Sequence, residues 1–224
     1  MKTLAKIALF AFLVLLAACT EIRVNSYADL SIQETAVPLW PERLEVSSHI
    51  GSCADLLRLS GYLQNEQEVY RLDVFAKADL GLLPWLDACV KQNYGDSYGA
   101  WAGVKALLIH KDKFYLALKP SYSYISDNYR GDYKVKAEGA EAHLLGSYLL
   151  GKSAVLTLAG RGSWHHLSFE GHQGDFWQWG VGANIKKEVG IFYYMPELGL
   201  GFMRPPDKEW SPLPFVGIGL GVKL

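Results

Sequence analysis

The residues best suited to chemistry form a polar cluster late in the chain. From Trp164 onward the sequence reads Trp-His-His-Leu-Ser-Phe-Glu-Gly-His, and Asp175 follows shortly after. If a strand continues through this stretch, alternate side chains share one face. When a histidine and a serine lie next to each other on such a face, the histidine can act as the base and the serine as the nucleophile in ester hydrolysis. The candidate catalytic residues are therefore His166, Ser168 and Glu170, with His172 on the same face. The alternative interpretation is a polar loop that enters water at the edge of a membrane.

Other catalytic and binding patterns are weak. His165, His166 and His172 match no strong metal-site spacing, so we expect no metal. Gly180-x-Gly182 lacks the third glycine and the strand–helix context of a nucleotide-binding loop. The sequence has no nucleophile elbow, Walker motif or zinc motif. We therefore expect no cofactor, and a non-enzymatic protein more than an enzyme.

The triplet His166-Leu167-Ser168 resembles the His-x-Ser pair of outer-membrane lipid A deacylases. Those enzymes use histidine, serine and glutamate, so the resemblance implies a lipid-modifying activity. The residues around the pair differ from that pattern, and no glutamate follows at a comparable spacing.

The first twenty residues carry an export signal. Lys2 and Lys6 precede an apolar run over Ile7–Leu16, which is too short to span a bilayer as a helix. The tetrapeptide at 16–19, Leu-Ala-Ala-Cys, resembles the lipobox of bacterial lipoproteins. That resemblance implies cleavage after residue 18 and acylation of Cys19. Thr20 follows instead of aspartate, which resembles the outer-membrane class of these lipoproteins.

Composition divides the mature chain into parts. Lys plus Arg number 22 against 23 Asp plus Glu, and no basic stripe suggests nucleic acid. Residues 19–48, with Pro38 and Pro41, indicate a lipid-anchored tether. Residues 49–94 show helical spacing, first over Leu56, Leu59 and Leu63, then over Val69, Leu72, Phe75 and Leu80, with Pro84 opening a third helix. In an exported protein, Cys53 and Cys89 predict a disulfide that ties this short helical segment together.

Residues 95–224 predict a mainly β fold, an antiparallel up-and-down barrel of about eight strands. Short connections alternate with longer polar ones at 127–138, 166–175 and 204–212. Seven strands are visible, and an eighth is expected from Tyr129–Lys136 or Ser31–Trp40. The visible strands are Tyr98–His110, Lys113–Ser126, Gly139–Leu150, Ser153–His165, Phe176–Lys186, Gly190–Met203 and Leu213–Leu224.

Each strand has one apolar face and one small or polar face. In the last strand Ile218 and Leu220 oppose Gly219 and Gly221. A membrane barrel would turn the apolar face to lipid and the glycines to the lumen, whereas a soluble barrel would do the reverse. Glycine on a water-facing strand weakens the strand without a compensating benefit, which favours the membrane barrel.

Three functions fit these observations. The first is a non-enzymatic envelope or assembly protein, lipid-anchored at the outer membrane and in contact with its lipid and with other envelope proteins. The second is a lipid-modifying outer-membrane enzyme that uses the His166 and Ser168 region. The third is a soluble lipocalin-like carrier that holds an apolar ligand inside the barrel.

Overall fold

The computed structural model describes residues 27–29, 32–39, 43–55, 70–94, 98–129, 133–169, 171–206 and 209–224, and nearly all of them lie in strands. The eleven strands are β1 (Tyr27–Asp29), β2 (Leu44–Asp55), β3 (Tyr70–Leu83), β4 (Leu86–Tyr94), β5 (Tyr98–Lys111), β6 (Phe114–Tyr129), β7 (Tyr133–Leu149), β8 (Ala154–Phe169), β9 (His172–Val189), β10 (Phe192–Arg204) and β11 (Ser211–Lys223). No helix among these residues is long and apolar enough to cross a bilayer.

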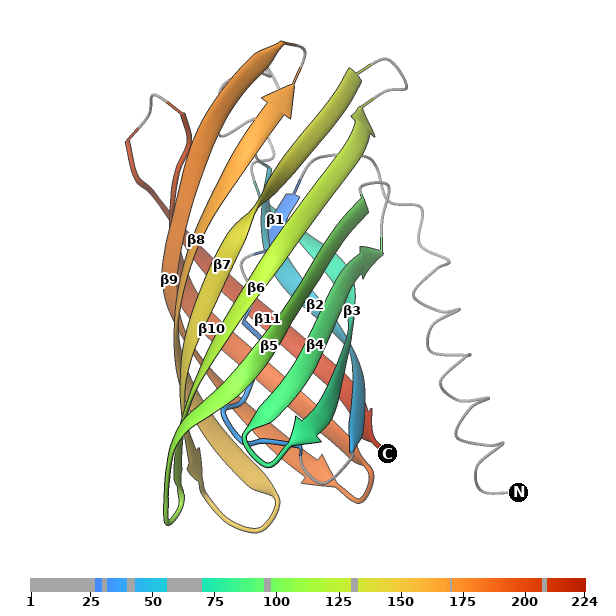
Figure 1. Cartoon of the computed structure of the whole chain (residues 1–224), viewed down its shortest axis with the longest axis vertical. Coiled ribbons are helices and arrows are strands. Elements are labelled where there is room, and N and C mark those ends of the chain that lie inside the picture. The colour runs from blue at the N-terminus through green and yellow to red at the C-terminus, as the bar shows by residue number, and fades with distance from the viewer. Residues whose placement is uncertain are drawn as a thin grey trace, which may run out of the picture.

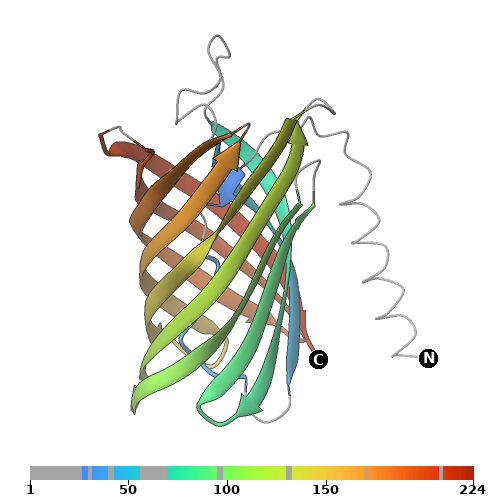
Figure 2. The ribbon, with the colours of Figure 1, turned by 45° about the horizontal axis from the view of Figure 1, so that its top comes forward.

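Strands β2 to β11 form a closed antiparallel barrel of ten strands (Figures 1 and 2). Each strand pairs with the next along the chain, and β2 closes the barrel by pairing with both β3 and β11. The short β1 pairs with the end of β2, at residues 53–55, beyond the last β11 partner at Gly51. Closure leaves no long unpaired edge.

The outer surface of the barrel is apolar. Large hydrophobic side chains are exposed on every strand from β2 to β11, among them Leu158, Val181, Leu198 and Leu220. Buried charged residues such as Lys77, Asp87, Lys105 and Glu197 point inward instead. This arrangement is that of a barrel in lipid and opposite to that of a soluble carrier, so the lipocalin-like hypothesis is wrong.

The interior is packed with two kinds of side chain. Near the longer connections, an apolar cluster gathers around Phe75, Trp101, Phe176 and Phe215. Toward the other rim, charged and hydroxyl side chains surround residues 32–39, which run through the lumen without regular secondary structure. The chain therefore passes from β1 at one rim, through the barrel, to the start of β2 near the opposite rim (Figure 1).

The two rims differ in their connections. At the rim near the C-terminus, β3–β4, β5–β6, β7–β8 and β9–β10 are joined by two to four residues. Two of these tight turns use left-handed backbone, at Asp112 with φ 52° and at Gly190 with φ 65°. We call this the turn rim. The opposite end, the loop rim, carries the two longest connections between barrel strands, residues 56–69 between β2 and β3 and residues 205–210 between β10 and β11, together with three connections of two or three residues.

The predicted helical segment over 49–94 is wrong for its described part, which forms β2, β3 and β4. In β3 the exposure alternates: Asp73, Phe75 and Lys77 face the lumen, while Val74 and Ala76 face outward. Phe75 and Leu80 therefore lie on opposite faces and form no helical stripe. Charged residues at inward positions hid the period of two. Pro84 sits in the turn between β3 and β4, and Leu56, Leu59, Leu63 and Val69 lie outside the described residues.

The predicted disulfide is also wrong. Cys89 is a free, buried thiol. Along β3, Cys53 pairs opposite Arg71 and Cys89 opposite Asp79. Eight residues of strand correspond to about 26 Å, whereas bridged Cα atoms lie less than about 7 Å apart.

The barrel also contains more strands than the alternating sequence pattern predicted, ten instead of eight. It begins at Leu44, inside the predicted tether. The stretches 127–138 and 166–175, predicted as loops, are mostly continuations of β6 to β9. Residues 32–39 of the candidate eighth strand lie inside the barrel instead of in its wall. Cys19 and the signal segment lie outside the described residues.

Candidate functional site

The hairpin of β8 and β9 positions the polar cluster at the loop rim. Its connection is Glu170 and Gly171, and Gly171 has φ 80°, a conformation suited to glycine. Because Phe169 pairs with His172, the register places His166 opposite Asp175 and Ser168 opposite Gln173. The side chain of Glu170 lies outside the described residues.

Strand alternation separates the two adjacent histidines. His165 is buried in the lumen, where its Nε2 lies 2.7 Å from Ser123 Oγ and its ring stacks on Phe176 at 4.7 Å. His166 is half-buried on the outer face, and Ser168 lies two residues further on the same face. His172 is exposed at the start of β9. The structure therefore brings His166 and Ser168 to one face and removes His165 from it.

On the outer face His166 has an acidic partner. Its Nδ1 lies 2.8 Å from Asp175 Oδ1, and the Trp164 side chain also hydrogen-bonds to Asp175. A carboxylate on Nδ1 orients the imidazole and leaves Nε2 as the nitrogen that can take up a proton. Both side chains are partly exposed, 39% for His166 and 50% for Asp175, so a substrate can reach them.

A second carboxylate flanks the histidine from β7. Glu138 pairs opposite His166, and the Tyr122 hydroxyl donates a hydrogen bond to Glu138 Oε2 at 3.1 Å. Glu138, His166 and Asp175 thus form a row across three neighbouring strands, which we call the acidic row. Sequence analysis missed this row because it depends on the register of three strands. The only sequence signal was the position of the β8–β9 turn.

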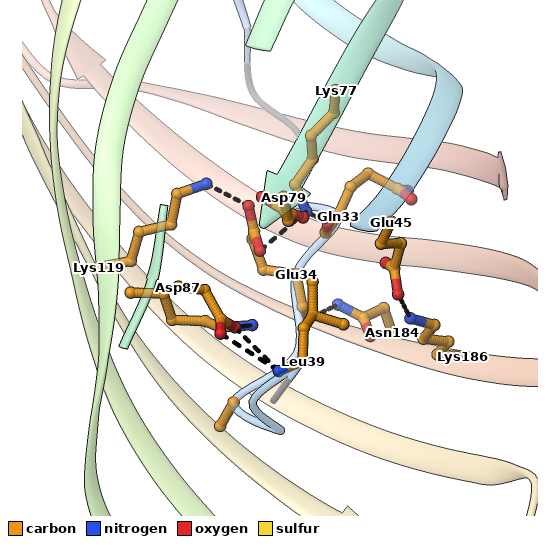
Figure 3. A network of polar contacts seen from close by, with 12 residues as sticks. Gln33, Glu34, Leu39, Glu45, Lys77, Asp79, Asp87, Lys119, Asn184 and Lys186 are labelled. Carbon is orange, nitrogen blue, oxygen red and sulfur yellow. Dashed lines mark hydrogen bonds and ion pairs between the residues drawn. The ribbon is translucent and has the colours of Figure 1, made fainter. Parts of the chain in front are cut away.

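The second feature is residues 32–39 inside the barrel, which we call the internal segment (Figure 3). The barrel wall supplies the hydrogen bonds that its irregular backbone lacks. Glu197 accepts from the Ile32 and Gln33 amides at 2.7 and 2.9 Å. Two further wall side chains accept from its backbone amides, Ser147 from Ala36 and Asp87 from Leu39. Three others donate to its backbone carbonyls, namely Asn184 to Glu34, Lys77 to Gln33 and Lys105 to Val37.

Ion pairs add to this attachment. The Glu34 carboxylate lies 2.9 Å from Lys77 Nζ and also pairs with Lys119. Lys105 pairs with Asp87 at 2.9 Å. All five side chains are buried, and Figure 3 shows Glu34 between the two lysines from β3 and β6. Since buried charges are tolerated only when paired, these contacts hold the internal segment in one position.

The packed interior leaves little space. Two cavities lined by lumen residues measure about 10 Å³ each, one next to Lys119 and His143 and one next to Glu34 and Lys77. Such a cavity is no larger than one water molecule. A larger hollow, of about 690 Å³, opens on the outer face, beside Tyr122, Trp164 and Trp177. Within the described residues, no group of three or more His, Cys, Asp or Glu side chains could hold a metal ion.

Comparisons with known proteins support the fold. No protein-family model matches the chain, and no curated protein matches it. Among solved structures, the chain is similar to an outer membrane channel from Pseudomonas putida F1, with a TM-score of 0.57 and 8% identity over 87% of this chain and 100% of that one. The outer membrane protease OmpT from Escherichia coli aligns with a TM-score of 0.43 and 11% identity, over 82% of this chain and 97% of OmpT. The chain therefore has the fold of an outer-membrane β-barrel.

Proposed function

We propose that this protein is a non-conducting outer-membrane barrel that serves the envelope through its outer face and rims. The observation that carries this proposal is the packed lumen, which is filled by residues 32–39 and by an apolar cluster that includes Ile32 and Ala36 of that segment. The similar protein from Pseudomonas putida is an outer membrane channel. In this chain, two cavities lined by lumen residues measure about 10 Å³ each, about the size of one water molecule.

Planar-bilayer recording tests the proposal. The purified full-length protein should insert and give no conductance steps above those of a protein-free bilayer. Correct folding of the same sample is checked by heat-dependent migration on a denaturing gel. Regular single-channel steps from folded protein would contradict the proposal and favour a channel.

A lipid anchor on Cys19 is the second part of the proposal. It is supported by the sequence Leu-Ala-Ala-Cys after an apolar run. A clickable palmitate analogue fed to cells should label the wild type and leave Cys19→Ala unlabelled. Cleaved wild-type protein without label would overturn the anchor.

The second candidate function is a lipid-modifying enzyme, supported by the 2.8 Å contact between His166 and Asp175 with Ser168 on the same face. In such a reaction His166 Nε2 takes the proton of the Ser168 hydroxyl as Oγ attacks an ester carbonyl. The ester C–O bond then breaks, His166 protonates the leaving alcohol, and water releases the fatty acid. Asp175 holds the imidazole in position throughout.

Mass spectra of envelope lipids from cells with and without the protein test this candidate. Deacylated lipid should appear with wild-type protein and disappear with Ser168→Ala and with Asp175→Asn. Identical spectra for the wild type and both variants would reject the enzyme hypothesis, and the non-enzymatic function would be the remaining candidate.

A further inference from the structure

The hollow of about 690 Å³ on the outer face lies across β5 to β9, and Trp210 of the β10–β11 connection also lines it. Its floor consists of small residues, because Ala140, Ala142 and Gly162 occupy outward positions, and the next outward row toward the turn rim carries Leu144. Tyr122, Trp164 and Trp177 stand beside them as walls. The hollow is a wide, open depression and not an enclosed pocket, and we call it the groove.

Strand register fixes how this groove meets the acidic row. Tyr122, Ala140, Trp164 and Trp177 are cross-strand partners in one row. The acidic row of Glu138, His166 and Asp175 is the next outward row toward the loop rim. One outward row further, Lys136 pairs opposite Ser168. The polar groups therefore cap the groove at one end.

The surroundings of the groove determine what fills it. It is continuous with the apolar outer face, so hydrocarbon is the medium that occupies it in a membrane. Aromatic residues such as Trp164 and Trp177 mark the level of lipid headgroups on membrane barrels. A ligand here has an acyl chain in the groove and its polar group next to the acidic row.

Charge selects the headgroup. The carboxylates of Glu138 and Asp175 suit a cationic group, and their exposed positions leave acceptor oxygens available to it. Lys136, also exposed, lies one row further out and suits an anion. This neighbouring pair of opposite signs matches a zwitterion that carries a phosphate and a primary ammonium.

We propose that the outer face of β5–β9 is a specific binding site for one aminophospholipid. One acyl chain lies over Ala140, Ala142 and Gly162, the ammonium group contacts Glu138 and Asp175, and the phosphate contacts Lys136. The site goes beyond the non-conducting envelope role and does not depend on catalysis by Ser168. If the second candidate function holds, the aminophospholipid bound at this site is the substrate whose ester reaches His166.

Native mass spectrometry of the purified full-length protein in detergent tests the site. The probes are phosphatidylethanolamine, phosphatidylcholine and phosphatidylglycerol with identical acyl chains. Wild type should retain one phosphatidylethanolamine at least tenfold more tightly than the other two, because the choline group has no N–H donor and the glycerol headgroup has no cation. Equal retention of all three lipids would overturn the proposal.

Two sets of variants locate the site. A Cβ at Gly162 would meet nothing within 4 Å, so Gly162→Leu fills the groove without disturbing the wall. Gly160→Leu is the matched control, since Gly160 on the same strand has equally open space and does not line the groove. Gly162→Leu should reduce phosphatidylethanolamine retention at least tenfold, and Gly160→Leu should leave it unchanged.

The paired change Glu138→Gln with Asp175→Asn should lower phosphatidylethanolamine retention to the level of phosphatidylcholine. Retention that is unaffected by Gly162→Leu, or by loss of both carboxylates, would refute the assignment. Each variant is first shown to be folded by its heat-dependent gel migration. Bilayer conductance is measured separately, so failure of this site leaves the non-conducting function standing.

Discussion

At the scale of single residues, the inward glycines of β11 set how closely the internal segment can approach the wall. A Cβ at Gly219 would lie 2.4 Å from Gln33 Oε1, while the flanking Ile218 and Leu220 are 45% and 56% exposed on the outer face. The sequence prediction that Gly219 faces the lumen is therefore confirmed. Its physical reason is the presence of a chain segment that the sequence did not reveal.

We expect Gly219→Leu to lower the free energy of unfolding by about 1–3 kcal/mol through overpacking of the lumen. The measurement is the loss of strand circular dichroism on heating in detergent. Gly160→Leu, the same exchange at an outward glycine with open space, should change stability by less than about 0.5 kcal/mol. Equal stability of the two variants would mean that Gln33 does not occupy the lumen beside Gly219.

Glu34 is the charged centre of the internal segment. Its carboxylate pairs with Lys77 and Lys119, and all three side chains are buried. Glu34→Leu leaves two buried ammonium groups without this partner and should cost about 3–5 kcal/mol of stability. Adding Lys119→Met to Glu34→Leu should recover part of that loss, measured by the same thermal unfolding. A double variant less stable than Glu34→Leu alone would contradict the pairing.

At the scale of elements, the structure explains which strands the sequence could predict. From β9 to β11 most outward positions are large and apolar and many inward ones are small or polar, so the period of two was visible. In β3, inward Asp73, Lys77 and Asp79 interrupt any apolar pattern, and the spacing was mistaken for helical. The loop-rim ends of β6–β9 carry polar residues outward, such as Glu138 and Asp175, and therefore resembled loops.

The same limit applies to the candidate site. His166 and Ser168 were identifiable because side chains two residues apart on a strand point to the same face. Asp175 was recognised as near in sequence but not as a partner, because its position opposite His166 follows from a connection of two residues at 170–171. The internal segment has no periodic pattern at all, since its backbone is satisfied by distant wall side chains such as Glu197 and Asn184.

Replacing residues 32–39 with a glycine–serine linker of equal length tests the segment as an element. The barrel should still form, because its strand pairings do not involve these residues. Stability should fall by more than about 3 kcal/mol, since Lys77, Lys119 and Glu197 all lose partners. Strand circular dichroism and thermal unfolding measure both effects. The control replaces the exposed turn at 150–153 in the same way and should be near neutral. A 32–39 replacement that is also near neutral would show that the internal segment adds no stability.

At the scale of the whole molecule, the path of the chain determines which side of the membrane its early residues reach. Outer-membrane barrels place short turns in the periplasm and longer loops outside. In this barrel the two longest connections between strands, 56–69 and 205–210, lie at the loop rim, whereas those at the turn rim have two to four residues. Because β1 pairs with residues 53–55 at the loop rim, we expect the chain to enter the barrel from the outside and to reach the periplasmic rim only after the internal segment.

We therefore expect a cysteine at Ala28 to react with a membrane-impermeant maleimide on intact cells, in a Cys53→Ser background that removes the neighbouring thiol. Glu209→Cys, exposed in the β10–β11 connection, should label equally and serves as the external reference. Lys152→Cys, exposed in the β7–β8 turn, should label only after the outer membrane is permeabilised. If Ala28→Cys instead behaves like Lys152→Cys, the chain does not enter from the loop rim. Cys19, the proposed lipidation site, precedes the first residue of β1, Tyr27, by eight residues, which span at most about 29 Å in a fully extended chain, so labelling at Ala28 also tests where the proposed anchor lies relative to the loop rim.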